Sequence, residues 1–457
     1  MTDFAKYIAE GKKGHLIGIG GVSMSPLAEV LRSMGLKIDG SDMAESEKTA
    51  HLRSLGIEIK LGHSSENLAH DTDFIVRTAA VRDDNPEIIA ARKKGIPVFE
   101  RTEAWGTIMR DYKNALCISG THGKTTTTSM ATHILMAARR DPTVMIGGTL
   151  PLLKASHRIG AGDTIIMESC EYFNSFHSFF PTIAVILNVE ADHLDFFKDL
   201  DDVKKSFRQF AELVPENGCV IANADDENTM NTVKSINREI LTFGMSPAAD
   251  VCGANLVRCG AQTELDIMYK GKCYTRLTLR VPGMHNVMNA LAASAAAIRL
   301  GISGEAISIG LADFTGAGRR FEFKGKLNGA DIYDDYAHHP GELKALIDAV
   351  ETLNYKRNII IFQPHTYTRT NALFDDFVQQ LRRPTLCYLA EIYAAREQNT
   401  IGISSGDLAQ QISGSRFFAS FAELEDSIRG EAQQGDIILT VGAGDVYRIG
   451  EHLAQEG

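Results

Sequence analysis

Short apolar runs alternate along the chain with glycine-containing loops and amphipathic stretches of helical period. Three units of this kind are clear. The first has an apolar run at 15–18 and a helical stretch at 26–34, the second a run at 115–119 and a helix through 139, and the third a run at 437–441 and a helix from 446. Short apolar runs bounded by turn residues are typical of buried strands. The alternation therefore predicts an α/β fold of mainly parallel sheets with helices on both faces.

The middle of the chain departs from this pattern. Residues 251–281 are rich in strand formers, and alternation at 275–281 predicts a peripheral antiparallel patch. An alanine-rich helix is predicted next, over 286–300.

Two breaks suggest where the chain divides. The stretch DYKN at 111–114 is polar, and TGAG at 315–318 is small and flexible. A chain of 457 residues is too long for one core. We therefore predict three domains, at 1–110, 111–316 and 317–457.

The charge balance limits the classes of partner. The formal net charge is −11, whereas a protein that binds nucleic acid or an anionic membrane usually carries the opposite sign. If the substrate is itself anionic, the cations that meet it must be local: a few Lys or Arg side chains, backbone amides and metal ions.

Cysteine usage and hydropathy point to a cytoplasmic protein. The seven cysteines include no CxxC pair, which argues against a disulfide framework and a structural zinc site. We find no signal-peptide pattern and no run of about 18 apolar residues.

The first glycine loop, GIGGVSMS, follows a predicted strand, and Asp42 lies about twenty residues further on. The glycines allow close backbone approach and the helix start can receive a diphosphate. The loop alone does not distinguish a dinucleotide from a UDP-sugar or from a purely structural turn.

The second glycine loop, GTHGKTT, is the most informative stretch. Its backbone N–H groups can cradle phosphates, Lys124 can neutralise their outer oxygens and the Thr125 hydroxyl can sit on Mg²⁺. The loop is shorter than the full P-loop pattern, because Ile118 stands where that pattern has its first glycine. We predict that ATP binds here and that Lys124 lies at a solvent-facing helix start.

Several other residues have two readings. Glu168 ends an apolar strand, where an ionised carboxylate needs a partner such as a metal, and His193 is either a ligand or a core residue.

Asn286 could be a helix N-cap, and the pair Arg319 and Arg320 could be a solvated hinge. The adjacent His338 and His339 would point to opposite faces of a strand, which argues against a metal pair.

The order of motifs resembles the Mur ligase family over residues 14–449. The motifs are GIGG, GTHGKTTTT, ESCEYFNSF, NVEADHLDFF, PGMHNVMNALAA, GAGRRFEF, DDYAHHP, FQPHTYTRT and VGAGD. The resemblance implies a Rossmann-like UDP-binding domain, a central P-loop ATPase domain and a C-terminal Rossmann-like domain for the amino acid. Within the family, it implies the branch that adds L-alanine to the lactyl carboxylate of UDP-N-acetylmuramate in peptidoglycan precursor synthesis.

The resemblance also implies roles for single residues. The UDP-substrate would contact Gly18, Gly20, Gly21, Ser23, Met24, Asp42, Thr78 in the turn at 78–80, Glu171, Asn174 and Ser175. ATP would contact Gly120, Thr121, His122, Gly123, Lys124, Thr125, Thr126, Asn286, Asn289, Arg319, Arg320 and Asp335. Mg²⁺ would be held by Thr125, Glu168 and His193, with Lys124, Glu168 and His193 as the catalytic set. L-alanine would contact His338, His339 and Arg369.

Two positions depart from the family. Cys170 stands where the family often has aspartate, and Thr366 where it has a second arginine. Thr366 removes one expected cation from the amino-acid site.

The same motifs limit the alternatives. An NAD-dependent dehydrogenase would leave GTHGKT and the DH pair unexplained, and a non-catalytic scaffold would not need Lys124, Glu168, His193 and Arg369 together. The nearest alternatives are the recycling ligase that attaches a whole tripeptide to UDP-N-acetylmuramate and the folate polyglutamylating ligases. The latter lack a UDP-binding first domain of this kind.

Overall fold

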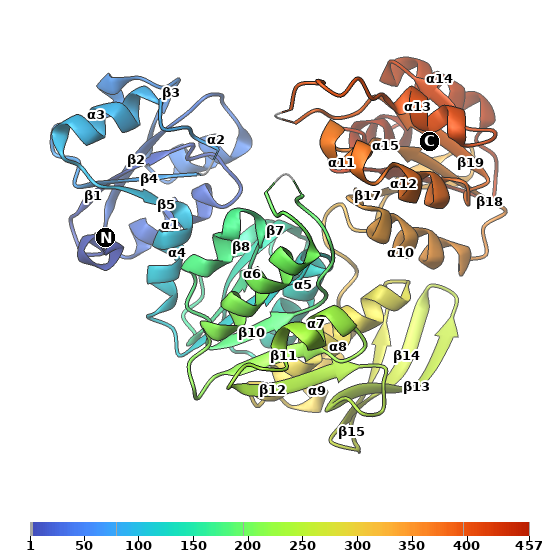
Figure 1. Ribbon diagram of the computed structural model, residues 1–457, viewed down its shortest axis with the longest axis horizontal. Coiled ribbons are helices and arrows are strands. Elements are labelled where there is room, and N and C mark those ends of the chain that lie inside the picture. Colours follow the sequence, from blue (N-terminus) through green and yellow to red (C-terminus); the bar gives the residue numbers. More distant parts are fainter. Residues whose placement is uncertain (1–2, 79, 195, 396, 457) are drawn as a thin grey trace.

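The computed structural model describes residues 3–78, 80–194, 196–395 and 397–456. Its strands form three sheets, each built from one continuous part of the chain (Figure 1). This arrangement confirms the predicted α/β class with three sheets that are mainly parallel.

The first sheet is parallel throughout and has the order β3-β2-β1-β4-β5. Its strands are β1 (Lys13–Ile17), β2 (Lys37–Asp42), β3 (Glu58–Leu61), β4 (Phe74–Arg77) and β5 (Val98–Glu100). The helices are η1 (Phe4–Tyr7), α1 (Met24–Ser33), α2 (Glu47–Ser54), η2 (Ser65–Asn67), α3 (Pro86–Lys94) and α4 (Arg101–Met109). The predicted first strand and helix are thus β1 and α1, each displaced by one or two residues.

The second sheet is the largest, with the order β15-β14-β13-β12-β11-β10-β6-β9-β7-β8. Its strands are β6 (Asn114–Ser119), β7 (Thr143–Leu150), β8 (Ala155–Arg158), β9 (Thr164–Glu168), β10 (Ile183–Ile186), β11 (Cys219–Asn223), β12 (Glu239–Gly244), β13 (Val251–Cys259), β14 (Gln262–Tyr269) and β15 (Lys272–Leu279). The run from β13 to β15 pairs antiparallel and confirms the predicted peripheral patch. The antiparallel β8 at the other edge was not predicted.

The helices of this part are η3 (Tyr172–Ser178), α5 (Lys124–Ala137), α6 (Leu200–Glu212), α7 (Glu227–Val233), α8 (Met284–Arg299) and α9 (Gly304–Ala312). The small side chains of the alanine-rich α8 are buried and let it pack closely on α5. These two helices confirm the predicted ones, and they bring the GTHGKT loop next to the start of α8.

The third sheet has the order β16-β17-β21-β18-β19-β20, with β16 antiparallel and the others parallel. Its strands are β16 (Glu322–Leu327), β17 (Ala330–Asp335), β18 (Arg357–Phe362), β19 (Leu386–Ala390), β20 (Arg416–Phe418) and β21 (Asp436–Val441). The helices are α10 (Pro340–Glu351), α11 (Tyr367–Ala372), α12 (Phe374–Leu381), α13 (Ser405–Gln411), α14 (Phe421–Glu431) and α15 (Tyr447–Ala454). The predicted third unit is β21 and α15.

One hydrophobic core joins the first and second sheets. It runs from Phe4 through Trp105 and Phe176 to Ile236 without a break. Helix α4, which lies between the two parts in Figure 1, packs against η3. The third sheet has hydrophobic clusters of its own on its two faces.

The predicted domain limits near 110 and 316 stay a prediction. Helix α4 ends at Met109 and β6 begins at Asn114, whereas α9 ends at Ala312 and β16 begins at Glu322. In the described part of the chain, no helix has both the length and the apolar character that a membrane crossing requires.

Candidate active site

The GTHGKT loop links β6 to α5 at the carboxyl edge of the second sheet. Two of its glycines adopt positive φ, 145° at Gly120 and 85° at Gly123. A side chain on Gly120 would come within 2.8 Å of the Leu187 Cβ atom. Asn188 fixes the loop, because its Oδ1 accepts the His122 N–H at 2.7 Å and its Nδ2 donates to the His122 carbonyl at 3.1 Å. The loop is therefore held open around the start of α5.

Lys124 is largely buried, so the prediction that it faces solvent is wrong. Its side chain is 15% exposed, and its Nζ donates to the Thr121 carbonyl and the Glu171 carboxylate, both at 3.0 Å. Burial lowers the pKa of Lys124, but the neighbouring Glu171 outweighs burial and raises it above its usual value. The ammonium group stays charged inside the site.

Thr125 and Glu168 provide neighbouring oxygen atoms. The Thr125 hydroxyl donates to Glu168 Oε1 at 2.9 Å, and Glu168 Oε2 accepts the Gly147 N–H at 2.6 Å. A hydroxyl beside a carboxylate is a donor set that suits Mg²⁺, which prefers oxygen ligands. These two side chains therefore fit the predicted metal.

His193 lines the same cavity as Thr125 and Glu168. Its backbone has φ of 53°, its ring stacks on Tyr172 with centroids 4.3 Å apart, and its Nε2 is 3.9 Å from Glu171 Oε1. Burial lowers the pKa of His193, which favours the neutral ring. A neutral imidazole has a lone pair available for a metal or a proton.

A cavity of about 720 Å³ lies where the second and third sheets meet. Most of the predicted catalytic and phosphate-binding residues line it: Thr121, His122, Gly123, Lys124, Thr125, Glu168, His193, Arg319 and Arg320. His338, predicted for the amino acid, lines it too. The structure thus brings together side chains that are more than 200 residues apart in the sequence.

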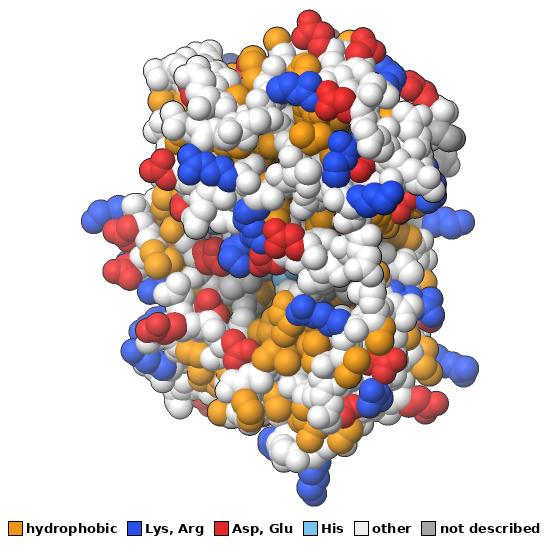
Figure 2. Space-filling view, turned by 90° about the vertical axis from the view of Figure 1, so that its right-hand side faces the viewer, with side chains coloured by type: hydrophobic (Ala, Val, Ile, Leu, Met, Phe, Trp, Pro, Cys, Tyr) orange, Lys and Arg blue, Asp and Glu red, His pale blue; other side chains and the backbone are white. Residues whose placement is uncertain are grey.

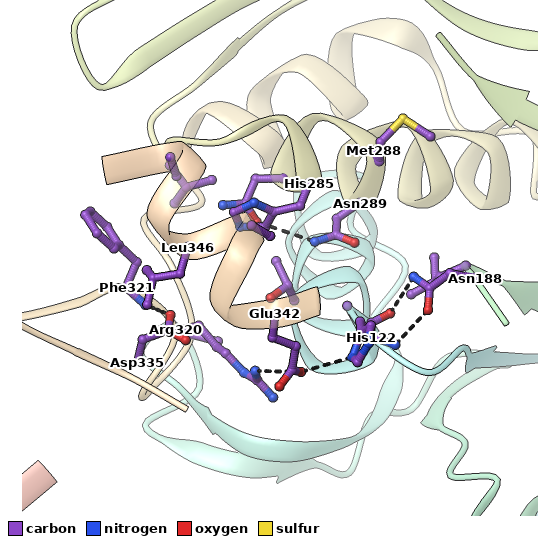
Figure 3. A pocket seen from close by; sticks show the side chains of 18 of the residues that line it. His122, Asn188, His285, Met288, Asn289, Arg320, Phe321, Asp335, Glu342 and Leu346 are labelled. Atoms are coloured by element: carbon purple, nitrogen blue, oxygen red, sulfur yellow. Dashed lines mark hydrogen bonds and ion pairs between the residues drawn. The ribbon is translucent and has the colours of Figure 1, made fainter. Parts of the chain in front are cut away.

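An adjoining cavity of about 260 Å³ opens beside the glycine loop. Asn286, Asn289, Thr126 and Asp335 line it together with His122, Gly123 and Arg320. Figure 3 labels Asn289, Asp335, His122 and Arg320 among them. Its walls include the apolar side chains of Phe243, Met288, Phe314 and Leu346. Figure 2 shows the molecule hollowed between its third and middle parts, with hydrophobic side chains below the hollow. Apolar walls with a few amide groups suit a flat heterocycle.

The two asparagines of this cavity have partners inside the protein. Asn289 Oδ1 accepts the Thr127 hydroxyl at 3.2 Å, and Asn286 Nδ2 donates to the Pro282 carbonyl at 2.6 Å. A side chain on Gly123 would come within 2.5 Å of Asn289 Oδ1. The start of α8 therefore packs directly against the phosphate loop.

Asp335 ends β17 at the rim of the smaller cavity. Its carboxylate accepts the N–H groups of Ala337 and Phe321, each at 2.8 Å. Burial raises the pKa of Asp335 to about 6, although Arg320 and the two amides oppose the shift. The carboxylate shapes the loop between the second and third sheets.

The two arginines of GAGRRFEF point in different directions. Arg319 donates to Asp334 at 2.8 Å and to the Gly442 carbonyl at 2.6 Å, so its guanidinium is held by the third domain. Arg320 lines both cavities and lies 3.8 Å from the Glu342 carboxylate. Of the two, Arg320 is the cation better placed to meet a ligand.

A third pocket, of about 180 Å³, contains Arg369, one of the three residues predicted to contact the amino acid. Thr366 and Arg369 line it with Asp192 and His193. Arg369 Nη2 donates to Asp192 Oδ1 at 3.0 Å, which joins the third domain to the middle one. Burial raises the pKa of Asp192, but Arg369 outweighs burial and holds it well below the usual range. Thr366 has φ of 67°, an unusual value for a β-branched residue.

The adjacent histidines diverge. His338 lines the large cavity, and burial lowers its pKa to about 4. His339 caps α10 and its ring lies against His122, with centroids 4.8 Å apart. Neither residue lines the pocket around Arg369.

The first glycine loop links β1 to α1 beside the first sheet, and its residues do not line the three cavities described above. Gly18 has φ of 76°, and the Gly20 N–H donates to Asp42 Oδ2 at 2.8 Å, so Asp42 braces the loop. Gly21 precedes α1, Met24 begins it, and Thr78 lies beside Gly18. Ala79, in the turn at 78–80, lies outside the described residues.

Ser23 connects this loop to α4. The Trp105 Nε1 donates to the Ser23 carbonyl at 3.2 Å, and the Arg101 guanidinium donates to the Ser23 hydroxyl. Both partners belong to the helix that packs against the middle domain.

Three polar side chains in and next to η3 form hydrogen bonds or ion pairs with other groups of the protein. Glu171 pairs with Lys124, Asn174 accepts the Ser206 hydroxyl at 2.5 Å, and Ser175 donates to the Tyr172 carbonyl at 2.6 Å. Cys170 lines the large cavity, and burial raises its pKa to about 11. The thiol therefore stays protonated at neutral pH.

Sequence reasoning missed four residues of the site: Asn188, Asp192, Glu342 and Arg101. Asp192 is part of the ADHLD motif, so its neighbour His193 offered a signal. Glu342 and Arg101 lie in no motif that was singled out, and only the folded chain places them beside the site.

Comparisons with known proteins agree on one family. The chain matches family models described as the Mur ligase family catalytic domain over residues 13–113, the Mur ligase middle domain over 118–297 and the Mur ligase glutamate ligase domain over 319–444. It is 45% identical to a UDP-N-acetylmuramate–L-alanine ligase of Clostridium novyi, covering 96% of each chain. A protein of the same name from Lachnospira eligens is 44% identical, covering 96% of this chain and 97% of the relative.

Solved structures give the same picture. The crystal structure of UDP-N-acetylmuramate-alanine ligase MurC from Thermotoga maritima superposes with a TM-score of 0.81 at 30% identity, covering 97% of this chain and 98% of that one. A MurF ligase from the same organism, in complex with ADP, has a TM-score of 0.65 at 14% identity, covers 92% of this chain and 96% of that one, and shows the shared fold.

Proposed function

The chain belongs to the Mur ligase family, and on that premise we propose that it uses ATP to join L-alanine to the lactyl carboxylate of UDP-N-acetylmuramate. This is a step of peptidoglycan precursor synthesis. The observation that carries the proposal is the 720 Å³ cavity, because one space is lined by the GKT loop and by third-domain side chains. Such a space can hold an activated carboxylate between a nucleotide and an incoming amine.

ATP is proposed to occupy the two adjoining cavities. The 260 Å³ cavity has the apolar walls and amide groups that a purine requires, and Asn286 and Asn289 line it. Its lining residues His122 and Gly123 also line the larger cavity, where Lys124 lies. The triphosphate would then run from one cavity to the other along the start of α5.

Mg²⁺ is proposed to be held by Thr125, Glu168 and His193, which line one cavity. When bound, it would neutralise charge that develops on the phosphate oxygens. The protein supplies the remaining positive charge: Lys124 and Arg320 line the same cavity in a chain whose net charge is −11.

The reaction is proposed to take two steps. The lactyl carboxylate attacks the γ-phosphorus of ATP, which forms an acyl phosphate and releases ADP. The uncharged amine of L-alanine then attacks the acyl carbon, phosphate leaves with its bonding electrons, and the amine proton is lost. Water would hydrolyse the intermediate, so closure of the third domain over the cavity protects it.

The amino acid is proposed to bind in the 180 Å³ pocket, with its carboxylate on Arg369. Asp192 holds this guanidinium in the structure, and it can also orient it when the carboxylate is present. His338 faces the reaction cavity, whereas His339 points toward His122; a contact of either residue with the amino acid requires a rearrangement on binding.

The UDP part of the substrate is proposed to bind at the first glycine loop, around Gly18, Gly20, Gly21 and Ser23. Asp42 holds the loop through Gly20. A titration of the intact protein with a UDP-sugar and with NAD tests this part separately. We expect the UDP-sugar to bind and NAD to bind poorly, and the opposite order would overturn the assignment.

The activity is tested by phosphate release from ATP with Mg²⁺ and UDP-N-acetylmuramate, with and without L-alanine. We expect release that depends on both substrates. In competition among L-alanine, glycine and L-serine, alanine should lead, but by a modest factor, because one methyl group separates ligands by only about 1–3 kcal/mol.

The alternative is the recycling reaction, in which a whole tripeptide is attached to the same sugar nucleotide. The relatives named as L-alanine ligases are 42–45% identical, whereas a murein peptide ligase of Psychrobacter arcticus is 23% identical and shows the fold. Adding L-Ala-γ-D-Glu-diaminopimelate to the competition decides between them. Preferential ligation of the tripeptide would move this chain to the recycling branch.

A further inference from the structure

His122, Glu190 and His339 come together at the contact between the middle and third domains. One potential ligand atom from each side chain lies within 4.8 Å of those of the other two. His122 belongs to the loop between β6 and α5, Glu190 follows β10, and His339 caps α10. The proposed Mg²⁺ site uses none of these side chains.

His122 is oriented by a carboxylate on each side. Its Nδ1 lies 3.4 Å from Glu342 Oε1, and its Nε2 lies 3.4 Å from Glu190 Oε2. Figure 3 shows Glu342 between Arg320 and His122. Histidines that bind metals usually hold a carboxylate or carbonyl on the other ring nitrogen. With Glu342 on Nδ1, the Nε2 atom of His122 faces Glu190 and is the position that can take a metal.

Both histidines have a buried nitrogen without a hydrogen bond. Among the described residues, Nε2 of His122 and Nε2 of His339 lack a hydrogen-bond partner. His339 is 6% exposed, and its Nδ1 accepts the Gly341 N–H at 3.2 Å. Buried polar atoms nearly always have a partner. Two unpaired imidazole nitrogens beside the Glu190 carboxylate therefore indicate a site for a bound ligand.

We propose that this cluster binds a divalent transition metal of the zinc class through His122, His339 and Glu190. Two imidazoles to one carboxylate favour such a metal, whereas Mg²⁺ prefers a site made mostly of oxygen ligands. Ligation through Nε2 of His339 moves its ring proton to Nδ1 and replaces the Gly341 contact. Any proton on Nε2 of His122 is released to solvent as the metal binds.

The metal would link the middle and third domains, which also meet through the Arg369–Asp192 pair. His122 and Glu190 belong to the middle domain and His339 to the third, so the bound ion holds the closed arrangement. His122 and Glu190 also line the 260 Å³ cavity, which leaves a fourth position for water or a ligand oxygen. Donors in tetrahedral zinc sites lie about 3.3 Å apart, so the three side chains must draw slightly together.

The inference is tested by titrating the metal-free, full-length protein with Co²⁺ and following its visible absorption. We expect one Co²⁺ per chain with the intense bands of a tetrahedral site. One equivalent of Zn²⁺ should displace it, and millimolar Mg²⁺ should not.

The ligands are tested with His339→Gln and Glu190→Gln, which alter opposite sides of the interface. Each should weaken Co²⁺ binding by at least about tenfold, whereas His452→Gln, on the exposed side of α15, should leave it unchanged. Circular dichroism identifies a variant that does not fold, and the other variant then decides. Absence of the bands in the wild type, or equal Co²⁺ binding in the variants, would overturn the proposal. His122 would then be a protonated ring held between Glu190 and Glu342.

Discussion

At the scale of single residues, the Lys124–Glu171 pair combines a stability role with the proposed catalytic one. Both side chains are mostly or fully buried, 15% and 3% exposed, and their charged atoms are 3.0 Å apart. Removing one partner of a buried pair leaves the other uncompensated.

Lys124→Ala should therefore abolish phosphate release and also lower the free energy of unfolding by about 3–5 kcal/mol. Urea unfolding and the phosphate assay measure the two effects. The double variant Lys124→Ala, Glu171→Gln removes the unpaired charge, so it should regain stability without regaining activity. Wild-type turnover in the single variant would refute the phosphate role of Lys124.

His15 carries a charge in the core of the first sheet. Its ring is 1% exposed, and Nδ1 lies 2.5 Å from Asp39 Oδ1. Burial lowers the pKa of His15, but Asp39 and Glu87 outweigh burial and raise it to about 9. The protonated ring thus stabilises the fold fully below about pH 6.5, and this contribution is lost as the pH rises through about 9.

We expect the first domain to lose stability on the order of 3 kcal/mol between pH 6.5 and 9.5. Trp105 is the single tryptophan and lies in α4, so its fluorescence during urea unfolding reports on this part of the molecule. His15→Gln should flatten the dependence, and His70→Gln, an exposed histidine of the same domain, should not. An equal slope in all three proteins would contradict the assignment.

At the scale of elements, α4 contacts the middle domain through a glycine. A Cβ atom on Gly106 would lie 1.9 Å from the Ser178 carbonyl oxygen, whereas around Gly430 in α14 nothing lies within 4 Å. Glycine weakens a helix interior, so its presence in α4 reflects the close approach of η3.

Gly106→Ala should lower the free energy of unfolding even though alanine is the better helix former. Gly430→Ala is the matched control, and it should raise stability by about 0.5–1 kcal/mol. Denaturant unfolding of the two variants makes the comparison. Equal stabilisation by both substitutions would show that α4 and η3 can separate at little cost.

How far the sequence predicts these elements depends on where the information lies. The strands and helices around both glycine loops were predictable, because apolar runs and glycines specify strand, turn and helix locally. The burial of Lys124 was not, since Glu171 approaches it from a segment 47 positions away. Glu342 reaches His122 only when the third domain packs on the middle one, and no local pattern encodes that contact.

At the scale of the whole molecule, the two contacts of the middle domain differ in kind. The first domain shares a hydrophobic core with it, whereas the clusters of the third domain are separate and charged pairs such as Arg369 and Asp192 cross that contact. Polar contacts can separate and reform more readily than a shared core, so the third domain is the part expected to move.

Asp192→Asn should shift the protein toward an open arrangement, because Arg369 loses its charged partner at the interface. Small-angle scattering of the substrate-free protein should show a larger radius of gyration than that of the wild type. Asp348→Asn removes a partner of Arg383 within the third domain and serves as the control. An unchanged radius in Asp192→Asn would show that other contacts hold the domains together.

The shared core also bears on how the chain folds during its synthesis. Its residues extend from Phe4 to Ile236, so half of the chain must leave the ribosome before that core can be completed. Until then, the apolar face of α4 is uncovered and open to aggregation or to chaperones. The third domain, with clusters of its own, can complete its packing as soon as its last strand, β21, and α15 emerge. The nascent protein is thus most exposed to misfolding between the emergence of α4 and that of Ile236.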